Sequence, residues 1–255
     1  MTARVLIIAG SDSGGGAGIQ ADIKTVTMLG GHAMTAITAI TAQNTLGVQG
    51  VHAVPAEMVL MQIDSVVADI GVDAVKIGMI GSAETAAAVA ERIAALDVPI
   101  VFDPVMVATS GSVLADAATI TAFGRLMDIA SLVTPNLPEL EALGGEAAVL
   151  AHGCHLLVKG GHAEGPRVVD TLVSPSGPRR HWDGKRFDTR DTHGTGCTLA
   201  SGVATGLAQG MAIGDATERA IRFVRMAMME APGLGQGHGP LGHQRVTDFL
   251  PAEDE

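Results

Sequence analysis

Short apolar runs alternate with segments of helical periodicity along the first two thirds of the chain. Runs rich in Val and Ile predict strands buried on both faces of a sheet, at 5–9, 34–41, 74–78, 100–104, 132–134, 155–159 and 168–173. Apolar residues recurring every three or four positions predict helices at 19–29, 55–70 and 82–96. This alternation predicts an α/β fold with a mostly parallel sheet covered on both faces, as a single domain over 1–255.

Polar residues follow several of the predicted strands. These residues are Asp12, Gln43, Asp103, Asn136 and Lys159. The carboxyl ends of parallel strands meet at one edge of the sheet, and ligands of open α/β sheets bind there. The pattern therefore predicts a ligand site formed by these side chains.

The stretch 191–201 reads as a glycine loop entering a helix that continues through Met211. Gly194 and Gly196 allow a close backbone approach, and the first helical turn offers unpaired N–H groups that suit an anion. The field of the helix would lower the pKa of Cys197 and favour a thiolate. Two structural alternatives remain open, because glycines at a helix entrance also serve close packing and a lone Cys is often a buried apolar residue.

A second glycine loop, 10–18, lies between the first strand and the first helix. Gly16 and Gly18 give only part of a dinucleotide-binding fingerprint, and Asp22 falls near the position of its third glycine. We therefore expect this loop to approach a small ligand, with Asp12 making a polar contact.

Carboxylates occur at two further strand exits, and each allows two interpretations. Asp103 could hold Mg²⁺, or Asp103-Pro104 could simply form a turn. Asn136 and Glu139 have the spacing of a capping box, and they could also order a metal.

Lys159 ends an apolar strand and needs a partner, because an unpaired buried ammonium is costly. A phosphate or a carboxylate such as Asp103 would serve. His162 and His193 could contact a ligand or could be ordinary loop residues.

Composition narrows the function classes. The net charge of −11 disfavours nucleic acids and anionic membrane surfaces, and the 2% of aromatic residues disfavours base-stacking platforms. The two cysteines form neither a disulfide framework nor a zinc pattern. Without a signal peptide or a spanning apolar segment, the protein is expected to be soluble and cytoplasmic.

The candidate groups together suit phosphoryl transfer: an anion cup, a lysine, carboxylates able to bind a metal and a residue able to take a proton. The chain lacks both the P-loop pattern and the protein-kinase motifs, so those two enzyme classes are excluded.

An ordered set of motifs makes this chemistry more specific. The motifs are GSDSGGGAGIQAD (10–22), TAQNT (41–45), KIGM (76–79), DPVM (103–106), TPNLPE (134–139), VKGGH (158–162), THGTGCT (192–198) and GHGP (237–240). In this order they resemble the hydroxymethylpyrimidine/phosphomethylpyrimidine kinases of thiamine biosynthesis, in the ribokinase-like superfamily. The resemblance spans nearly the whole chain.

The resemblance implies a ribokinase-like three-layer α/β/α sandwich and a homodimer. It also implies ATP- and Mg²⁺-dependent phosphorylation of 4-amino-5-hydroxymethyl-2-methylpyrimidine and then of its monophosphate. Ser11 and Ser13 flank Asp12 where some members have Thr and Pro, and Thr109 stands where many members have Lys.

Site roles follow from the resemblance by motif position. The anion hole would comprise Gly194, Thr195, Gly196 and Cys197, with Cys197 where related sugar kinases have an Asp base. Gln43 would hydrogen-bond the pyrimidine in a pocket lined by Gly10, Asp12, Met79 and Val105. Lys159 would meet the ATP phosphates, and the metal would be supported by Asp103, Asn136 and Glu139.

Two other functions remain as alternatives. A pyridoxal or pyridoxine kinase is one, although the amide of Gln43 favours an aminopyrimidine because it can both donate and accept. The other is a catalytically silent nucleotide sensor, against which the set of Asp103, Lys159 and Cys197 argues. A scaffold protein is disfavoured because so many polar strand ends share one edge.

Overall fold

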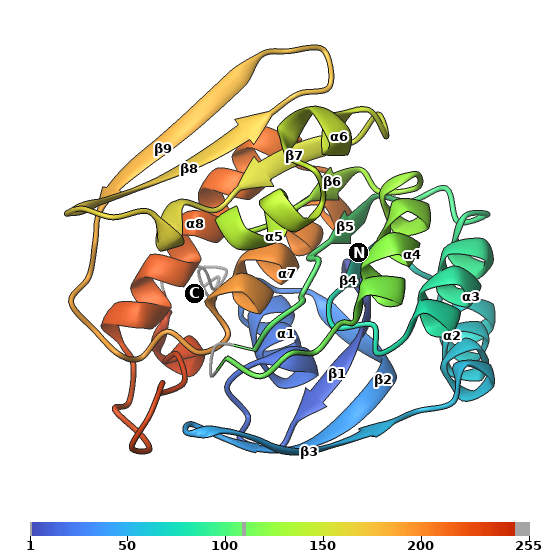
Figure 1. The fold of residues 1–255 in the computed structure, drawn as a ribbon, viewed down its shortest axis with the longest axis horizontal. Coiled ribbons are helices and arrows are strands. Elements are labelled where there is room, and N and C mark those ends of the chain that lie inside the picture. Colours follow the sequence, from blue (N-terminus) through green and yellow to red (C-terminus); the bar gives the residue numbers. More distant parts are fainter. Residues whose placement is uncertain (1, 109–110, 248–255) are drawn as a thin grey trace, which may run out of the picture.

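The computed structural model describes residues 2–108 and 111–247, and nine strands in this part of the chain form one sheet (Figure 1). Its order is β3-β2-β1-β4-β5-β6-β7-β8-β9. The strands are β1 (Arg4–Asp12), β2 (His32–Asn44), β3 (Gly47–Ala53), β4 (Ala74–Ile77), β5 (Ile100–Phe102), β6 (Leu132–Val133), β7 (His155–Val158), β8 (Arg167–Val173) and β9 (Arg179–Lys185). The six strands from β2 to β7 in this order are parallel, whereas β3, β8 and β9 join antiparallel at the edges.

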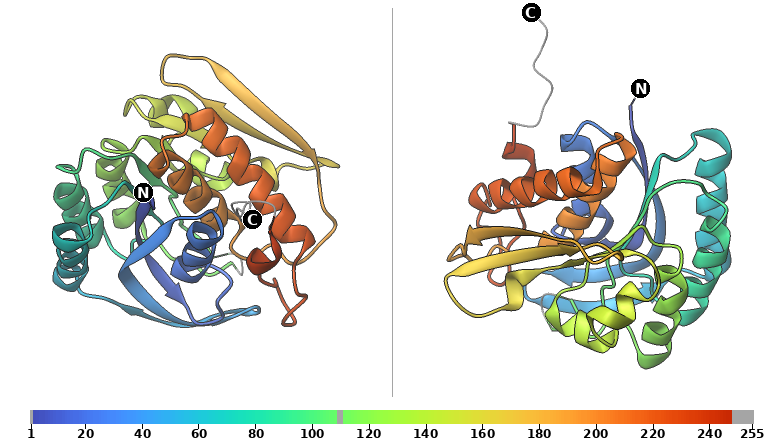
Figure 2. Two further views of the ribbon diagram at one scale, coloured as in Figure 1. Left: turned by 180° about the vertical axis from the view of Figure 1, so that it is seen from behind. Right: turned by 90° about the horizontal axis from the view of Figure 1, so that it is seen from above.

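Helices cover both faces of the sheet, which gives three layers (Figures 1 and 2). One face carries α1 (Gly18–Met28), α7 (Thr195–Ala208) and α8 (Ile213–Met229). The other carries α2 (Ala56–Asp69), α3 (Ala83–Ile93), α4 (Ala117–Met127), α5 (Leu137–Ala142) and α6 (Glu146–Leu150). Successive side chains of β1 alternate between the two cores, with Val5 and Ile7 toward α7 and Leu6 and Ile8 toward the opposite helices. The predicted α/β/α sandwich with a mostly parallel sheet is confirmed.

Each strand and helix predicted from periodicity is present, with ends shifted by a few residues. The largest shifts lengthen β1 and β2, so that Asp12 and Gln43 belong to the strands themselves. Helices α4, α6 and α8 and strands β3 and β9 were not predicted. Strand β9 has no apolar run, because most of its residues are charged or polar and exposed. No helix among the described residues is long and apolar enough to cross a bilayer.

A glycine-rich segment, 233–242, links two parts of the molecule that are distant in sequence. The N–H of His238 donates to the carbonyl of Thr45, in the β2–β3 turn, at 3.0 Å. The carbonyl of Gly239 accepts from the N–H of His193, just before α7, at 3.1 Å. A Cβ at Gly237 would overlap the Thr45 carbonyl oxygen, so this close approach requires glycine.

Candidate active site

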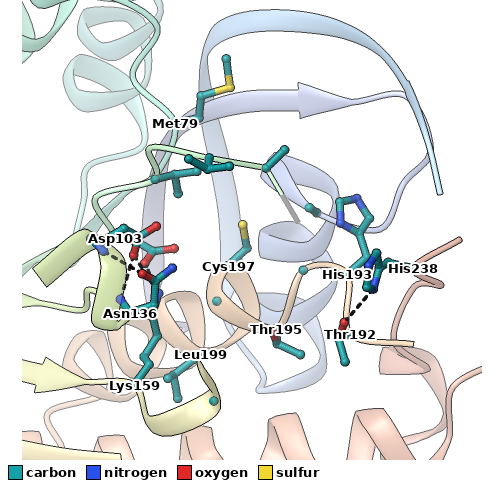
Figure 3. A pocket seen from close by; sticks show the side chains of 18 of the residues that line it. Met79, Asp103, Asn136, Lys159, Thr192, His193, Thr195, Cys197, Leu199 and His238 are labelled. Atoms are coloured by element: carbon teal, nitrogen blue, oxygen red, sulfur yellow. Dashed lines mark hydrogen bonds and ion pairs between the residues drawn. The ribbon is translucent and has the colours of Figure 1, made fainter. Parts of the chain in front are cut away.

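A cleft of about 1100 Å³ opens at the carboxyl ends of the parallel strands (Figure 3). It brings together all the residues to which the family resemblance gave a site role. These are Gly10, Asp12, Gln43, Met79, Asp103, Val105, Asn136, Glu139, Lys159, Gly194, Thr195, Gly196 and Cys197. Thr109 lies outside the described residues.

The first turn of α7 forms the floor of a cup within this cleft. Gly194 caps the helix with φ of 88°, and it approaches the carbonyl of Gly16 so closely that no side chain would fit. This glycine therefore serves both close packing and the formation of the cup. Within the described residues, the N–H groups of Gly196 and Cys197 have no acceptor. A Cβ at Gly196 would lie 3.2 Å from the Lys159 ammonium. This space between N–H groups and a cation fits an anion such as a phosphoryl group.

The sequence left open whether Lys159 pairs with a phosphate or with a carboxylate. In the structure its partner is a carboxylate. Its Nζ lies 2.7 Å from Oδ1 of Asp103 and 3.8 Å from Oε2 of Glu139 (Figure 3). Thr134 also donates to Asp103 Oδ1, at 3.0 Å. Burial alone would lower the pKa of Lys159, but Asp103 and Glu139 raise it above its ordinary value, so the ammonium stays charged.

Asn136 and Glu139 form the capping box that their spacing predicted. The Asn136 side chain accepts from the Glu139 N–H at 2.9 Å, and the Glu139 carboxylate accepts from the Asn136 N–H at 2.8 Å. Burial and Asp103 raise the pKa of Glu139 despite the opposing charge of Lys159. The structural role of Asn136 is therefore confirmed, and its role toward a metal stays a prediction.

The carboxylates offer a partial set of metal ligands. Oδ2 of Asp103 accepts no hydrogen bond from the described residues and faces Gly196. In the same part of the chain, no three His, Cys, Asp or Glu side chains gather closely enough to hold a metal. Two carboxylates completed by water and phosphate oxygens are a donor set that suits Mg²⁺ bound together with a nucleotide.

Asp12 lines the cleft but its oxygens are used within the protein. They accept from the N–H groups of Gly14, Gly16 and Ala17, and Oδ2 lies 2.9 Å from Nε2 of His193. Burial would raise the pKa of Asp12, but the hydrogen bond from His193 and those from the backbone lower it. Asp12 therefore shapes the 10–18 loop, and the polar ligand contact expected from the sequence stays a prediction.

Gln43 lies next to His193, its Nε2 3.3 Å from the ring Nε2. If His193 donates to Asp12 through this nitrogen, the Gln43 amide is better placed with its oxygen toward the ring and its nitrogen toward Thr41. Thr41 is then left to donate to the Ser11 carbonyl, at 2.9 Å. His193 thus orients Gln43, a contact that its position in a loop did not predict.

The prediction of a lowered pKa for Cys197 is wrong. Burial raises the pKa of this thiol to about 11, and the nearby Lys76 ammonium offsets only part of the effect. The helix N-terminus favours the thiolate, but although Cys197 keeps some exposed surface at the cleft, the surrounding protein removes most of the water from the sulfur and desolvation is the larger influence. In the protein alone, Cys197 is a thiol at neutral pH.

Two features in and behind the cleft were not predicted from the sequence. One is the apolar wall formed by Phe187, Ile221, Val224 and Met228, mostly from the unpredicted helix α8. The other is Lys76, which lies in β4 and is paired with Asp22 of α1 at 2.8 Å. A lysine within an apolar strand, and an aspartate on the apolar stripe of Ile19 and Val26, were the available signals.

Comparison with known proteins identifies relatives over nearly the whole chain. The model of the phosphomethylpyrimidine kinase family matches residues 12–242. A hydroxymethylpyrimidine/phosphomethylpyrimidine kinase of Streptomyces coelicolor is 48% identical, over 94% of this chain and 93% of its own. The thiamine biosynthesis bifunctional protein ThiED of Geobacter sulfurreducens is 46% identical over 98% of this chain, which spans about half (53%) of that relative.

Solved structures with the same fold include two kinds of vitamin kinase. The pyridoxal kinase of Staphylococcus aureus, in complex with AMP-PCP and pyridoxal, gives a TM-score of 0.86 at 29% identity, over 96% of each chain. A phosphomethylpyrimidine kinase of Clostridium difficile gives 0.76 at 36% identity, over 88% of this chain and 98% of that one. These similarities confirm the expected ribokinase-like fold.

Proposed function

Since this chain belongs to the phosphomethylpyrimidine kinase family, we propose that it phosphorylates 4-amino-5-hydroxymethyl-2-methylpyrimidine and then its monophosphate, with ATP as donor and Mg²⁺ as cofactor. This assigns it to thiamine biosynthesis. One observation carries the proposal: Lys159 and the open first turn of α7 converge on a cleft that also contains Gln43.

The acceptor would lie at the end of the cleft next to Gln43. Its amide, held by Thr41 and His193, presents fixed donor and acceptor groups to an aminopyrimidine edge. Met79 and Val105 supply apolar contacts, and a Cβ at Gly10 would meet the Met79 sulfur at 3.0 Å, so glycine leaves room for this side chain. These contacts support binding of a flat, polar-edged ring.

The nucleotide would lie on the side of α7 opposite to the acceptor and Gln43. The apolar wall of α8 and Phe187 suits adenine, and Arg225 stacks on Phe187 at 4.6 Å. Lys159 would exchange part of its contact with Asp103 for phosphate oxygens. When bound, Mg²⁺ would be held by Asp103 and Glu139 and would neutralise phosphate charge.

In the first reaction, the acceptor hydroxyl oxygen forms a bond to the γ-phosphorus while the bond to the bridging oxygen of ADP breaks. The N–H groups of Gly196 and Cys197, with Lys159, stabilise the charge on the transferring group. For Cys197 to accept the hydroxyl proton, its thiol must first release its own proton to solvent in the cleft, so only the thiolate form of the protein carries out this step. In the second reaction the acceptor is a phosphate monoester, largely ionised at neutral pH, so no base is required there.

A pyridoxal kinase is the second candidate, because solved pyridoxal kinases match the fold at TM-scores of 0.86–0.87. The higher identity to pyrimidine kinases, 48% against 29–30%, favours the first.

ADP release with Mg²⁺-ATP tests both candidates, in separate reactions with hydroxymethylpyrimidine, its monophosphate, pyridoxine, pyridoxal and ribose. Turnover of both pyrimidines is expected. Turnover of the vitamin B6 compounds alone would support the second candidate. ATP binding without any turnover would indicate the nucleotide sensor.

We also propose that the chain acts as a single kinase domain within a homodimer. Exposed large apolar side chains gather on β2, β3, their turn and α2; they are Ile40, Leu46, Val51, Met58 and Met61. β3 is in addition an unpaired sheet edge. Light scattering after size exclusion tests this, and a monomer of 25.9 kDa would contradict it.

A further inference from the structure

A fully buried ion pair lies behind the sulfur of Cys197. Lys76 Nζ is 2.8 Å from Asp22 Oδ2, and both side chains have no exposed surface. Asp22 Oδ1 accepts from Ser201 Oγ at 2.7 Å. The pair therefore ties together β4, α1 and α7, and the mechanism described above does not use it.

Helical spacing places Cys197 next to this pair. Cys197 and Ser201 are four residues apart on α7 and so lie on one side of that helix. Gly18 and Asp22 have the same spacing on α1, where the Gly18 N–H points at the Cys197 sulfur while Asp22 bonds Ser201. Lys76 lies behind the wall of the cleft that Cys197 lines, and it has no exposed surface of its own. The two helix faces thus hold the sulfur, the carboxylate and the ammonium in one cluster.

We propose that Lys76 and Asp22 are positioning residues that set the ionisation of Cys197, with Lys76 favouring the thiolate and Asp22 opposing it. The carboxylate of Asp22 and the thiol of Cys197 share one fully buried cation, so Lys76 can compensate the negative charge of only one of them. The other charged groups facing the sulfur are Asp103 and Lys159, which largely offset each other as an ion pair. No water reaches the pair, so its charge is weakly screened on the side of Cys197 that faces the protein, while the other side of this residue is partly exposed at the cleft.

The proposal requires opposite effects from the two halves of one ion pair. Asp22→Asn keeps the shape and removes the competing negative charge, so the thiolate becomes easier to form. Lys76→Met removes the cation, and Asp22 then takes up a proton in its buried site. The thiolate becomes harder to form, and the double variant Lys76→Met/Asp22→Asn is expected to match Lys76→Met.

The test measures the alkylation rate of Cys197 by iodoacetamide between pH 7 and 9, with peptide mass spectrometry to separate it from Cys154. Below the pKa of a thiol this rate follows the thiolate fraction. Asp22→Asn is expected to raise the rate about tenfold or more, and Lys76→Met to lower it. Ser201→Ala is the matched control, since it removes a hydrogen bond to Asp22 without changing a charge.

An unchanged or lowered rate in Asp22→Asn would overturn the proposal, as would an equal increase in Ser201→Ala. The proposal rests on the assigned role of Cys197 in the proposed kinase reaction, yet alkylation needs neither ATP nor acceptor. Opposite shifts in a protein without turnover would therefore uphold the proposal and contradict the function. Turnover of both pyrimidines with unshifted alkylation would do the reverse.

Discussion

Two lysine–aspartate pairs flank the first turn of α7, and their geometry is almost the same. The nitrogen–oxygen distance is 2.7 Å between Lys159 and Asp103 and 2.8 Å between Lys76 and Asp22. They differ in access. The Lys159 side chain is 15% exposed at the cleft, whereas Lys76 and Asp22 are completely buried.

This difference in solvent access gives the two lysine–aspartate pairs different roles. A lysine at the cleft can exchange a carboxylate for a phosphate when a nucleotide arrives. A sealed lysine cannot exchange partners, so it acts as a fixed charge on its neighbours. Substitutions in both pairs and in their neighbours test this distinction.

The largest effect is expected at Cys197, between the two pairs. Cys197→Ala should lower kcat for the hydroxyl acceptor by about 10²–10⁴-fold, the usual contribution of a base. For the monophosphate, which needs no proton removed, the loss should be much smaller. Steady-state rates with each acceptor check this, and equal losses would contradict the role of Cys197 as a base.

Lys76→Met should cost the most stability. Removing one partner of a buried ion pair costs about 3–5 kcal/mol, because Asp22 must then either keep an uncompensated charge or take up a proton in its buried site. Urea unfolding measures the loss, with Lys159→Met as the comparison, for which water at the cleft should keep the loss smaller. Equal losses of unfolding free energy would mean that access does not distinguish the pairs.

Lys159→Met should instead act on turnover. Loss of one charge-stabilising donor costs about 10²–10³-fold in kcat, and this donor should matter for both acceptors. Lys159→Arg, which keeps the charge, should recover part of the rate. A Met variant with full kcat would exclude Lys159 from the phosphate site.

A hydrogen bond between two uncharged side chains, Thr198 of the same turn of α7 and His243, makes the unfolding free energy depend on pH. Burial lowers the pKa of His243 from 6.5 to about 4, and its Nε2 lies 2.8 Å from Thr198 Oγ1. The unfolded chain therefore binds a proton between pH 6.5 and 4 that the folded chain does not bind. This contribution is complete above pH 6.5 and is lost as the pH falls, by about 2–3 kcal/mol. Unfolding at pH 7 and 5 should show a difference that His243→Gln removes.

The smallest effect is expected at the helix cap beside Lys159. Asn136→Ala should lower the unfolding free energy by about 1 kcal/mol. Ser82→Ala, at the cap of α3, is a control remote from the carboxylate cluster and should cost a similar amount. If Asn136 also supports Mg²⁺, only Asn136→Ala should raise the Mg²⁺ concentration needed for half-maximal rate.

Local patterns predicted much of the site because parallel strands end together. Asp103, Asn136 and Lys159 follow three neighbouring strands, so their positions in sequence were enough to bring them together. The state of Cys197 could not be read in this way. The field of helix α7 arises from the same segment as Cys197, whereas the loss of water around the sulfur comes from α1 and β4, which are distant in the chain. The apolar wall formed by α8 was not predicted for a similar reason, since the apolar face of α8 is defined by its packing against α7.

The glycine segment 233–242 also affects how mutational data on this protein should be interpreted. Gly237 lies against the backbone carbonyl of Thr45, where no Cβ fits, and a Cβ at Gly239 would force the Asp191 carboxylate to move. A library of single substitutions should therefore find Gly237 as intolerant as Lys159, and Gly239 less so. Intolerance there would report backbone proximity between the acceptor side and the entrance of α7, and it would occur at residues that take no part in the reaction.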